Sequence, residues 1–498
     1  MNTGKVRRYN AAKPPPHPVH PDHASMTRIL DESPMRPIHY RIWALSTGGT
    51  LLSGVSVFLL GVTLPLVTPI FALPAAGIGL AAAMLMGGTV VGAPLGGHLA
   101  DRFGRKPVMI LDMALLMLAT PLAALAPDAT TLIGAELLVG MGIGMDFPVG
   151  SSYLAEFMPQ GRRGRMMAAS IAVQSIGMLT GAGFALILLQ GARAGDSTWR
   201  WLLAIEALLV LPYLIGRLTL PESVRWCMGR GRNAQALRTL ESFAPQQKEA
   251  LSAMVHHLGR KTHQVAKVRP GRRMGIGTLF SPAYRRRTFL VTLPWFFMDV
   301  ATYGVGLFTT ILLGTMRSSG TPGLGTLTRD FTNTLDSSKV DVFLLLGSLL
   351  SLWAVPRLGR IRMQIIGFTG MSLGMGLLYF ATGMTGGSGA HLPLVLLGFI
   401  TFNLFMTAGP NATTFILPTE MYPTQVRAFS AGFAAAVAKI GATVSVFLLP
   451  VIQAALGVTM VLVLMGGVSL LGLLMTYLFR VQGHGLTLEE HHGPTLPQ

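Results

Sequence analysis

A single carboxylate stands within an otherwise apolar stretch, WFFMDVATYGVGLF, at residues 295–308. Asp299 follows Trp295 by four residues and precedes Tyr303 by four. In a helix, positions i, i+4 and i+8 lie on roughly one face, so the carboxylate is placed between two aromatic rings with polar tips. This arrangement indicates part of a functional site, and the rest of the chain must provide the helices that build it.

The composition places this segment in a membrane protein. Of the 498 residues, 51% are hydrophobic and 12% are charged, against about 25% charged in soluble domains. The mean hydropathy is +0.53. The one cysteine, Cys227, excludes an internal disulfide framework, a cysteine-based zinc site and a cysteine-ligated iron–sulfur cluster. We expect no cofactor and no metal, and no enzymatic activity, because no nucleophile–base pair or metal-ligand spacing occurs.

About twelve apolar runs are long enough to cross a bilayer as helix, which needs ~20 residues. They predict an all-α membrane protein. The runs fall near 42–70, 77–100, 106–126, 131–154, 166–192, 199–219, 287–314, 338–356, 361–383, 392–418, 426–451 and 456–480.

Lys and Arg gather in the loops after spans 2, 4, 6, 8 and 10, and the opposite loops carry almost none apart from a mixed-sign stretch around 317–341. This positive-inside pattern predicts a multi-pass protein of a bacterial inner (cytoplasmic) membrane with both termini cytoplasmic. The net charge of +18 is therefore mostly a topology signal. We expect no nucleic-acid partner and a weak attraction to anionic membrane lipid.

The spans divide into two groups of six. Residues 42–219 and 287–480 are predicted to form two helical bundles, joined by a basic cytoplasmic linker at 220–286. The polar segment 1–41 is predicted to be a disordered cytoplasmic tail, and 481–498 a second cytoplasmic tail.

A weak internal repeat supports duplication of one bundle. GGHLADRFGRKPVMI (96–110) and GSLLSLWAVPRLGRIRMQII (347–366) occupy corresponding places in the two halves. In each, a helix ends in a short Arg–x–Gly–Arg turn before the next span begins. The second copy has Pro356 where the first has Asp101.

The first of these segments carries a family resemblance. GHLADRFGRK (97–106) resembles the signature loop of the major facilitator superfamily. LAEFMPQGRRGR (154–165), PESVRW (221–226) and PTEMYPTQVRAFSAG (418–432) resemble other cytoplasmic-side motifs of its sugar-porter and phosphate-porter branches. The resemblance implies two six-helix bundles that rock around a central site and open it alternately to each side.

Acids and arginines lie within ten residues of each other in these motifs, at the cytoplasmic helix ends. Ion pairs there are predicted to latch the two bundles while the inner side is closed, at only ~0–1 kcal/mol for each partly exposed pair. The alternative is that the charges only fix the topology. The predicted latch comprises Asp101, Arg102, Arg105, Glu156, Arg165, Glu222, Arg225, Arg357, Arg360, Glu420 and Arg427.

Besides Asp299, a small set of ionisable and amide side chains interrupts the spans. An ionisable residue at membrane depth costs at least ~2.5–3.5 kcal/mol, so each one calls for an explanation. The set comprises Asp112, Glu136, Asp146, Gln174, Glu206, Asn411 and Lys439.

Four segments resemble the phosphate:proton symporter branch more closely: GIGMDFPVGSSYLAEF (142–157), WFFMDVATYG (295–304), AGPNATTFILPTE (408–420) and AVAKIGA (436–442). The resemblance implies a central anion site, with Phe147 replacing a tyrosine and removing one hydroxyl donor. The implied substrate site comprises Asp146, Phe147, Gln174, Trp295, Asp299, Tyr303, Asn411 and Lys439.

The chemistry of these side chains suits dihydrogen phosphate. Asn and Gln amides, Trp N–H and Tyr O–H donate to phosphate oxygens, and an aspartate accepts from P–OH. Two carboxylates beside an anion require that at least one takes up a proton. We expect Asp146 to carry the coupling proton and Asp299 to receive phosphate. In the alternative, Asp146 caps a kink beside Pro148 and Asp299 pairs with Lys439 to hold the bundle together.

Besides Phe147, the chain departs from the branch at three further positions. Ser53 and Ser56 stand where related symporters commonly have aspartates, so any proton relay through span 1 is missing or rerouted. Glu136 stands where relatives usually have an arginine, and this reversal either alters the packing of span 4 or supplies a substitute acid.

The predicted function is secondary active transport by alternating access, with proton-coupled uptake of inorganic phosphate. A sugar or organic-acid:proton porter of the same superfamily is the first alternative. A membrane sensor that binds substrate without net transport is the second, which the missing span 1 acids leave open. The expected partners are a small-molecule anion, protons and membrane lipid, with no obligate protein partner.

Overall fold

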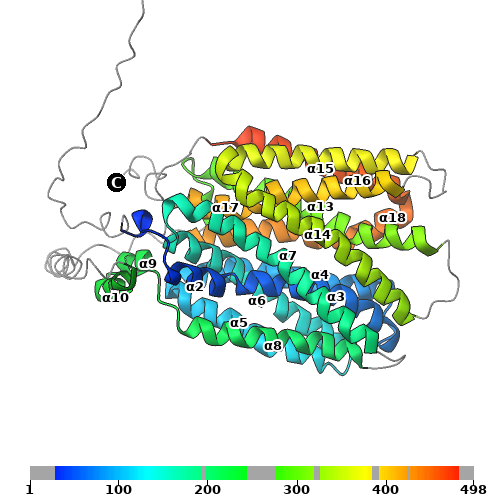
Figure 1. Cartoon of the computed structure of the whole chain (residues 1–498), viewed down its shortest axis with the longest axis horizontal. Helices are drawn as coiled ribbons and strands as arrows, with labels where there is room; N and C mark the ends of the chain where they lie inside the picture. Colours follow the sequence, from blue (N-terminus) through cyan, green and yellow to red (C-terminus); the bar gives the residue numbers. More distant parts are fainter. Residues whose placement is uncertain are drawn as a thin grey trace, which may run out of the picture.

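The computed structural model describes residues 29–191, 197–243, 276–318, 326–383, 392–422 and 427–481. Within these residues the chain is helical, with short turns and no strand. Long helices run side by side along one axis, with the N-terminal half on one side and the C-terminal half on the other (Figure 1). The predicted all-α fold of two helical bundles is confirmed.

The six predicted spans of the N-terminal half are confirmed as membrane-length helices. The first span is built from two consecutive helices that meet at Thr47. The helices are α2 (Pro37–Ser46), α3 (Gly48–Ile70), α4 (Ala75–Phe103), α5 (Arg105–Ala124), α6 (Ala129–Phe157), α7 (Gln160–Gly191) and α8 (Thr198–Leu218).

Among its described residues, the C-terminal half contains four helices long and apolar enough to cross a membrane and one shorter apolar helix. Two of them run on as the single element α18, which breaks at Gly457, where φ is +79°. The span predicted at 338–356 contains the shorter apolar helix Val342–Leu358. The elements are α13 (Arg285–Ser318), α14 (Thr326–Leu358), α15 (Arg360–Gly383), α16 (Leu392–Met406), the π-helical turn η2 (Thr407–Asn411), α17 (Ala412–Met421) and α18 (Arg427–Phe479).

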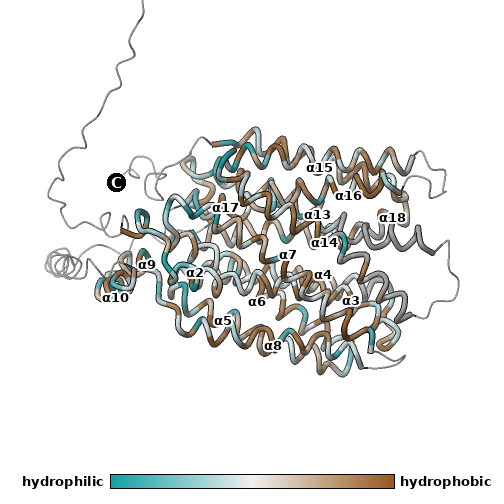
Figure 2. The backbone as a smooth tube through the Cα atoms, in the orientation of Figure 1, coloured by the Kyte–Doolittle hydropathy of each residue, from teal (hydrophilic) through white to brown (hydrophobic). Residues whose placement is uncertain are grey.

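Large apolar side chains point outward along the helices, as a lipid-facing surface requires. Leu118 is 73% exposed and Leu208 is 68% exposed. Hydrophilic residues gather at one end of the bundle, around α9 (Val224–Gly229) and α10 (Asn233–Phe243) (Figure 2). We name this the linker end, and the other the opposite end.

The two halves meet along two seams. α4 packs along α18, and α7 packs along α14. The Arg–x–Gly–Arg repeat is visible as two equivalent turns, between α4 and α5 and between α14 and α15. Gly104 (φ +113°) and Gly359 (φ +87°) occupy them, in a backbone region where glycine has no Cβ penalty. The sequence repeat therefore encodes the same tight turn in both halves.

Part of the predicted disordered tail is ordered, which corrects the boundary at residue 41. Leu30 is 1% exposed and His39 is fully buried. The His39 ring packs edge-on against Phe243 of α10 at 4.9 Å between centroids. Because these partners come from the linker, some 200 positions away, local composition gave no sign of them. Residues 1–28 lie outside the described residues.

Candidate functional site

Lys439 of α18 is the centre of a buried polar cluster. Its Nζ lies 2.9 Å from Asp299 Oδ2 and donates to the Tyr303 hydroxyl at 3.0 Å. Asp299 is 2% exposed and Lys439 is 8% exposed. The pairing of Asp299 with Lys439, one of the two explanations for Asp299, is therefore present, and it does not exclude a role in binding.

The N-terminal half contributes an aromatic wall to this cluster. Lys439 Nζ lies 5.9 Å from the centre of the Phe147 ring of α6 and 4.7 Å from that of Tyr303, within the range of cation–π attraction. Phe147 packs edge-on against Phe415 of α17 at 6.1 Å. The Lys439 cluster therefore lies where the two halves meet.

The expected helical face on α13 is realised. α13 is continuous through Trp295, Asp299 and Tyr303, so these residues stack at four-residue intervals. The Trp295 side chain is 6% exposed and lies one helical turn before Asp299 on the same face. The aspartate is thus paired with the Lys439 ammonium and flanked along its helix by two aromatic residues.

Two predicted amides, Gln174 and Asn411, are half-buried. Asn411 ends the π-helical turn, where Pro410 has no N–H to continue the regular helical bonding. Gln174 precedes Ser175, whose hydroxyl lies 3.3 Å from that of Ser348 on α14. Within the described part of the chain neither amide has a hydrogen-bond partner in the protein, so both keep donors for a ligand.

Asp146 does not join the Lys439 cluster, although Phe147 beside it does. Its Oδ1 accepts from Arg217 at 2.5 Å, and Arg217 also donates to Asp112 at 2.8 Å. The Arg217 guanidinium also donates hydrogen bonds to the backbone carbonyls of Leu45 and Met109. This Arg217 triad, Asp112–Arg217–Asp146, is buried inside the N-terminal half. The sequence analysis did not single out Arg217, because an arginine at the end of span 6 fits the positive-inside pattern of basic residues at the cytoplasmic helix ends.

Four of the predicted latch residues form a buried network at the linker end. Glu156 Oε1 accepts from Arg105 at 2.9 Å and from Arg427 of the other half at 3.3 Å. Asp101 accepts from the Phe429 backbone N–H at 2.8 Å, also across the halves, and pairs with Arg105 at 3.1 Å. Arg105 and Arg427 are fully buried, which corrects the expectation of partly exposed pairs.

The remaining predicted latch residues behave differently from one another. Glu420 pairs with Arg360 at 2.8 Å, within the C-terminal half. Glu222 accepts from the backbone N–H groups of Arg105 and Ser223; burial raises its pKa and these donors lower it. Arg225 pairs with Asp31. Three others are exposed, with no ion pair to a described residue: Arg102, Arg165 and Arg357.

The linker end also contains an acid that the sequence did not single out. Asp31, in the segment before span 1, accepts from Arg163 of α7 and from Arg225 of α9, the latter at 2.8 Å. It is buried with them. A lone acid in a polar, proline-rich region gave no signal of these partners.

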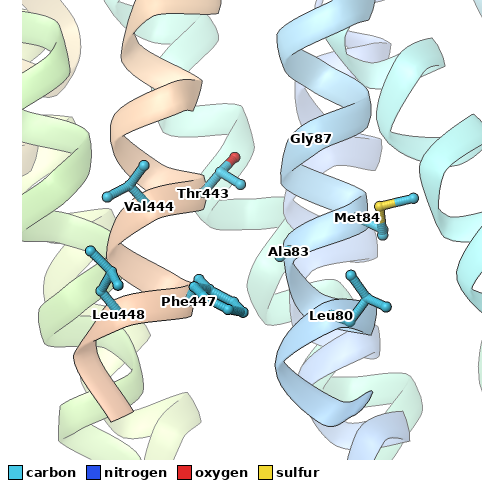
Figure 3. A pocket seen from close by; sticks show the side chains of 8 residues that line it. All are labelled: Leu80, Ala83, Met84, Gly87, Thr443, Val444, Phe447 and Leu448. Carbon is cyan, nitrogen blue, oxygen red and sulfur yellow. The ribbon is translucent and has the colours of Figure 1, made fainter. Parts of the chain in front are cut away.

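The seam between α4 and α18 differs at its two ends. A Cβ built on Gly97 would meet the Ala428 carbonyl oxygen, so the backbones touch at the linker end. At the opposite end a cavity of about 410 Å³ separates the same helices. There Phe447 of α18 points toward Leu80 of α4 across the gap (Figure 3). The lining residues are Leu80, Ala83, Met84, Gly87, Thr443, Val444, Phe447 and Leu448.

Comparisons with known proteins identify the fold and family. The family model described as "Sugar (and other) transporter" matches residues 71–493. The inner membrane metabolite transport protein YgcS of Escherichia coli K12 is 31% identical over 476 residues, covering 92% of this chain and 95% of that protein. The repressible high-affinity phosphate permease of Neurospora crassa is 30% identical over 397 residues, covering 72% and 67%.

Among solved structures, the proton:xylose symporter XylE of E. coli, bound to 6-bromo-6-deoxy-D-glucose, matches with a TM-score of 0.72 at 21% identity. The match covers 91% of this chain and 98% of that one. It extends over both halves, so the two-bundle arrangement is shared. With the family match over most of its length, the chain belongs to the sugar (and other) transporter family of the major facilitator superfamily, a family of multi-pass membrane transporters.

Proposed function

We propose that this transporter takes up inorganic phosphate together with protons, by alternating access of the Lys439 cluster to the two sides of a bacterial inner membrane. One observation carries the proposal. A buried ammonium, with a hydroxyl at 3.0 Å and a carboxylate at 2.9 Å, lies where the halves meet. An ammonium supplies charge and donors to an anion, and an aspartate accepts from P–OH.

Charge balance favours uptake of a proton with the anion. The Lys439–Asp299 pair is neutral as a unit, so dihydrogen phosphate would add one uncompensated negative charge to a buried site. Such a charge costs several kcal/mol in a protein interior. A proton taken up with the anion removes this penalty, which gives a physical reason for symport.

Asp146 remains our candidate for the coupling proton, now together with Asp112. Two carboxyl groups share one guanidinium in the Arg217 triad. With both ionised, the triad has a net negative charge inside the membrane, and one proton neutralises it. Asp112 Oδ2 has no hydrogen-bond partner among the described residues, so it offers a position for that proton.

The conformation is consistent with a transporter whose substrate site opens toward one side of the membrane. The seam between α4 and α18 is closed at the linker end and separated by the apolar cavity at the opposite end. We place the linker end and both termini in the cytoplasm from the distribution of basic residues. The observed state is then outward-facing.

A proton-coupled sugar or organic-acid porter is the second candidate. The aromatic rings of Phe147, Trp295 and Phe415 line the region around Lys439, and sugar rings pack well on aromatic faces. The fold shared with a proton:xylose symporter adds to this alternative.

Proteoliposomes loaded with purified protein test the proposal. We expect labelled phosphate to accumulate when an inward proton gradient is imposed, and unlabelled xylose to compete poorly. Uptake indifferent to the gradient excludes symport, and binding without uptake favours the sensor.

Variants of the Lys439 cluster identify the substrate class. Asp299→Asn is expected to abolish phosphate binding in a folded protein, and Lys439→Gln to reduce affinity at least about tenfold, since a charge-assisted hydrogen bond contributes ~1.5–3 kcal/mol. Lys106→Gln, at the linker end, is the matched control. Unchanged phosphate affinity in both cluster variants would rule out this site.

A further inference from the structure

A histidine outside the sites above holds the segment before the first span against the linker. His39 of α2 is fully buried, and its ring packs edge-on against Phe243 of α10 at 4.9 Å between centroids. Phe243 in turn stacks on Phe157, the last residue of α6, at 5.4 Å. His39 therefore anchors the N-terminal segment, residues 29–39, on an aromatic stack that ends beside Glu156 of the buried network.

Both ring nitrogens of His39 have partners within this segment. The Arg36 backbone N–H donates to Nδ1 at 3.1 Å, so Nδ1 is an acceptor and carries no hydrogen. Nε2 lies 3.4 Å from the Ser33 hydroxyl, which donates its own hydrogen to the Leu30 carbonyl at 2.9 Å. A serine hydroxyl has one hydrogen, so Nε2 is the donor in this contact. The docked segment thus fits the neutral imidazole with its hydrogen on Nε2.

A second proton on the ring is incompatible with this arrangement. It would bind at Nδ1 and face the Arg36 N–H, which would replace a hydrogen bond by two opposed hydrogens. The imidazolium would also be a fully buried charge without an ion pair to a described residue. Cation–π attraction to Phe243 returns less than the cost of burying an unpaired charge. Protonation therefore favours release of the ring.

The ionisable groups of the helices packed against α2 are bound elsewhere or lie nearer the surface. On α6, Glu156 pairs with two arginines of the buried network, and Tyr153 donates to the Pro221 carbonyl. On α8, Arg217 is held in its triad, and α3 contributes no ionisable side chain. The other ionisable side chains of the segment, α2 and α10, Asp31 apart, are exposed or half-buried: Glu32, Arg36, Tyr40, Arg41, Arg238 and Glu241.

The N-terminal segment also carries the acid that binds the linker end. Asp31 pairs with Arg163 of α7 and Arg225 of α9. Arg225 Nε in turn donates to the Glu156 backbone carbonyl at 3.4 Å. Docking of His39 thus places a counterion on two arginines beside the buried network. If the segment leaves, these arginines lose that counterion, and the closed linker end loses support.

We infer that His39 is a proton sensor at the linker end: the neutral ring docks the N-terminal segment, and protonation releases it together with Asp31. The docked state is favoured at neutral pH and lost as the pH falls, as for any histidine buried in its neutral form. Its effect on uptake rests on the proposed function, whereas the docking does not. Because symport carries protons inward, an acidified cytoplasm would then weaken the closed linker end and slow further loading.

Spin-label distances on the full chain in lipid nanodiscs test the docking. With Cys227 replaced by serine, labels at the exposed positions Pro34 and Arg162 report the distance from the segment to α7. We expect one short distance at about pH 8 and a longer, broader distribution at about pH 5.5, across the range in which histidine titrates. A distance that is the same at both pH values overturns the inference.

Two substitutions separate the charge of the ring from its shape. His39→Asn keeps an acceptor for the Arg36 N–H and cannot be protonated in this range, so the segment should stay docked throughout. His39→Lys carries a charge throughout, so the segment should be released even at about pH 8. His98→Asn is the matched control, because His98 is an exposed histidine at the same end and should not affect the titration. If His39→Asn keeps the wild-type pH dependence, another group is the sensor and the inference fails.

Uptake into proteoliposomes of known orientation tests the consequence. At a fixed outside pH, lowering the inside pH reduces the driving force equally for the wild type and His39→Asn. We expect the wild type to lose about fivefold more of its initial phosphate uptake, as a loss of support at the linker end implies. Equal losses in both, with the segment still released in the wild type, mean that the segment does not control transport and contradict the sensor. If the wild type transports no phosphate, the proposed function fails while the label distances still decide the docking.

Discussion

The two ends of the seam between α4 and α18 differ in the kind of contact they make. At the linker end, backbones touch at Gly97 and Ala428, and the Asp101 carboxylate binds the Phe429 N–H of the other half. At the opposite end an apolar cavity of about 410 Å³ lies between the same helices. One end closes by directional bonds, and the other can close by apolar contact alone.

This difference separates the tasks of the two ends. Directional bonds between buried charges form only at one geometry, so the linker end should be either fully closed or fully open. Apolar walls have no such requirement, so the opposite end can narrow gradually around a substrate. We therefore expect the balance between the two states to be set mainly at the linker end.

Replacing Glu156 should have the largest effect, because Glu156 joins Arg105 to Arg427 across the halves. Breaking a buried ion pair by removing one partner costs ~3–5 kcal/mol, about 10²–10⁴-fold in an equilibrium constant. Glu156→Gln should therefore open the linker end and close the cavity.

Spin-label distances measure this change at both ends. Cys227, the only cysteine, is buried and can be replaced by serine first. Labels at the exposed positions Arg165 and Arg357 report the linker end, and labels at Leu80 and Phe447 report the cavity. The first distance should lengthen and the second shorten in Glu156→Gln. If both distances stay at their wild-type values, Glu156 is not a latch.

A methyl group at Gly97 should have the next largest effect. The added Cβ would overlap the Ala428 carbonyl oxygen, whereas a Cβ at Gly87, on the same helix beside the cavity, would meet nothing within 4 Å. Overpacking costs ~1–3 kcal/mol, so Gly97→Ala should shift the same distances toward the linker-open state. Gly87→Ala is the control, and an equal shift in both variants would refute a seam closed by backbone contact.

The sequence predicted those parts of the molecule that depend on local pattern. Hydropathy located the spans because each span needs a long apolar run wherever its neighbours lie. The face shared by Trp295, Asp299 and Tyr303 followed from helical periodicity alone. The glycine turns after Arg102 and Arg357 repeated because one backbone geometry needs the same residue twice.

The sequence could not predict which side chain of another helix each site residue contacts. Asp146 and Phe147 are adjacent, yet one binds Arg217 and the other faces Lys439. Neighbouring residues on a helix point about 100° apart, and only the packed bundle shows what each one meets. Asp31 was missed for the same reason, since Arg163 and Arg225 reach it from distant segments.

Asp31→Asn should weaken the linker end by a smaller amount. Asn removes the charge shared by Arg163 and Arg225, but both arginines lie outside the C-terminal half, so only part of the lost pairing, about 1 kcal/mol, should act on the contact between the halves. Thermal unfolding and the Arg165–Arg357 label distance should both move in the direction found for Glu156→Gln, by less. An effect as large as that of Glu156→Gln would place the main latch at Asp31 instead.

The smallest effect is expected on the second seam, where Ser175 of α7 faces Ser348 of α14 at 3.3 Å. A single hydrogen bond between membrane helices contributes ~0.6 kcal/mol, about threefold in an equilibrium constant. Ser170→Ala is the control, because Ser170 donates only to the Met166 carbonyl of its own helix. If Ser175→Ala shifts the label distances more than Gly97→Ala does, the seam between α7 and α14 sets the conformational balance. The contrast between the two ends of the α4–α18 seam would then reflect that balance without determining it.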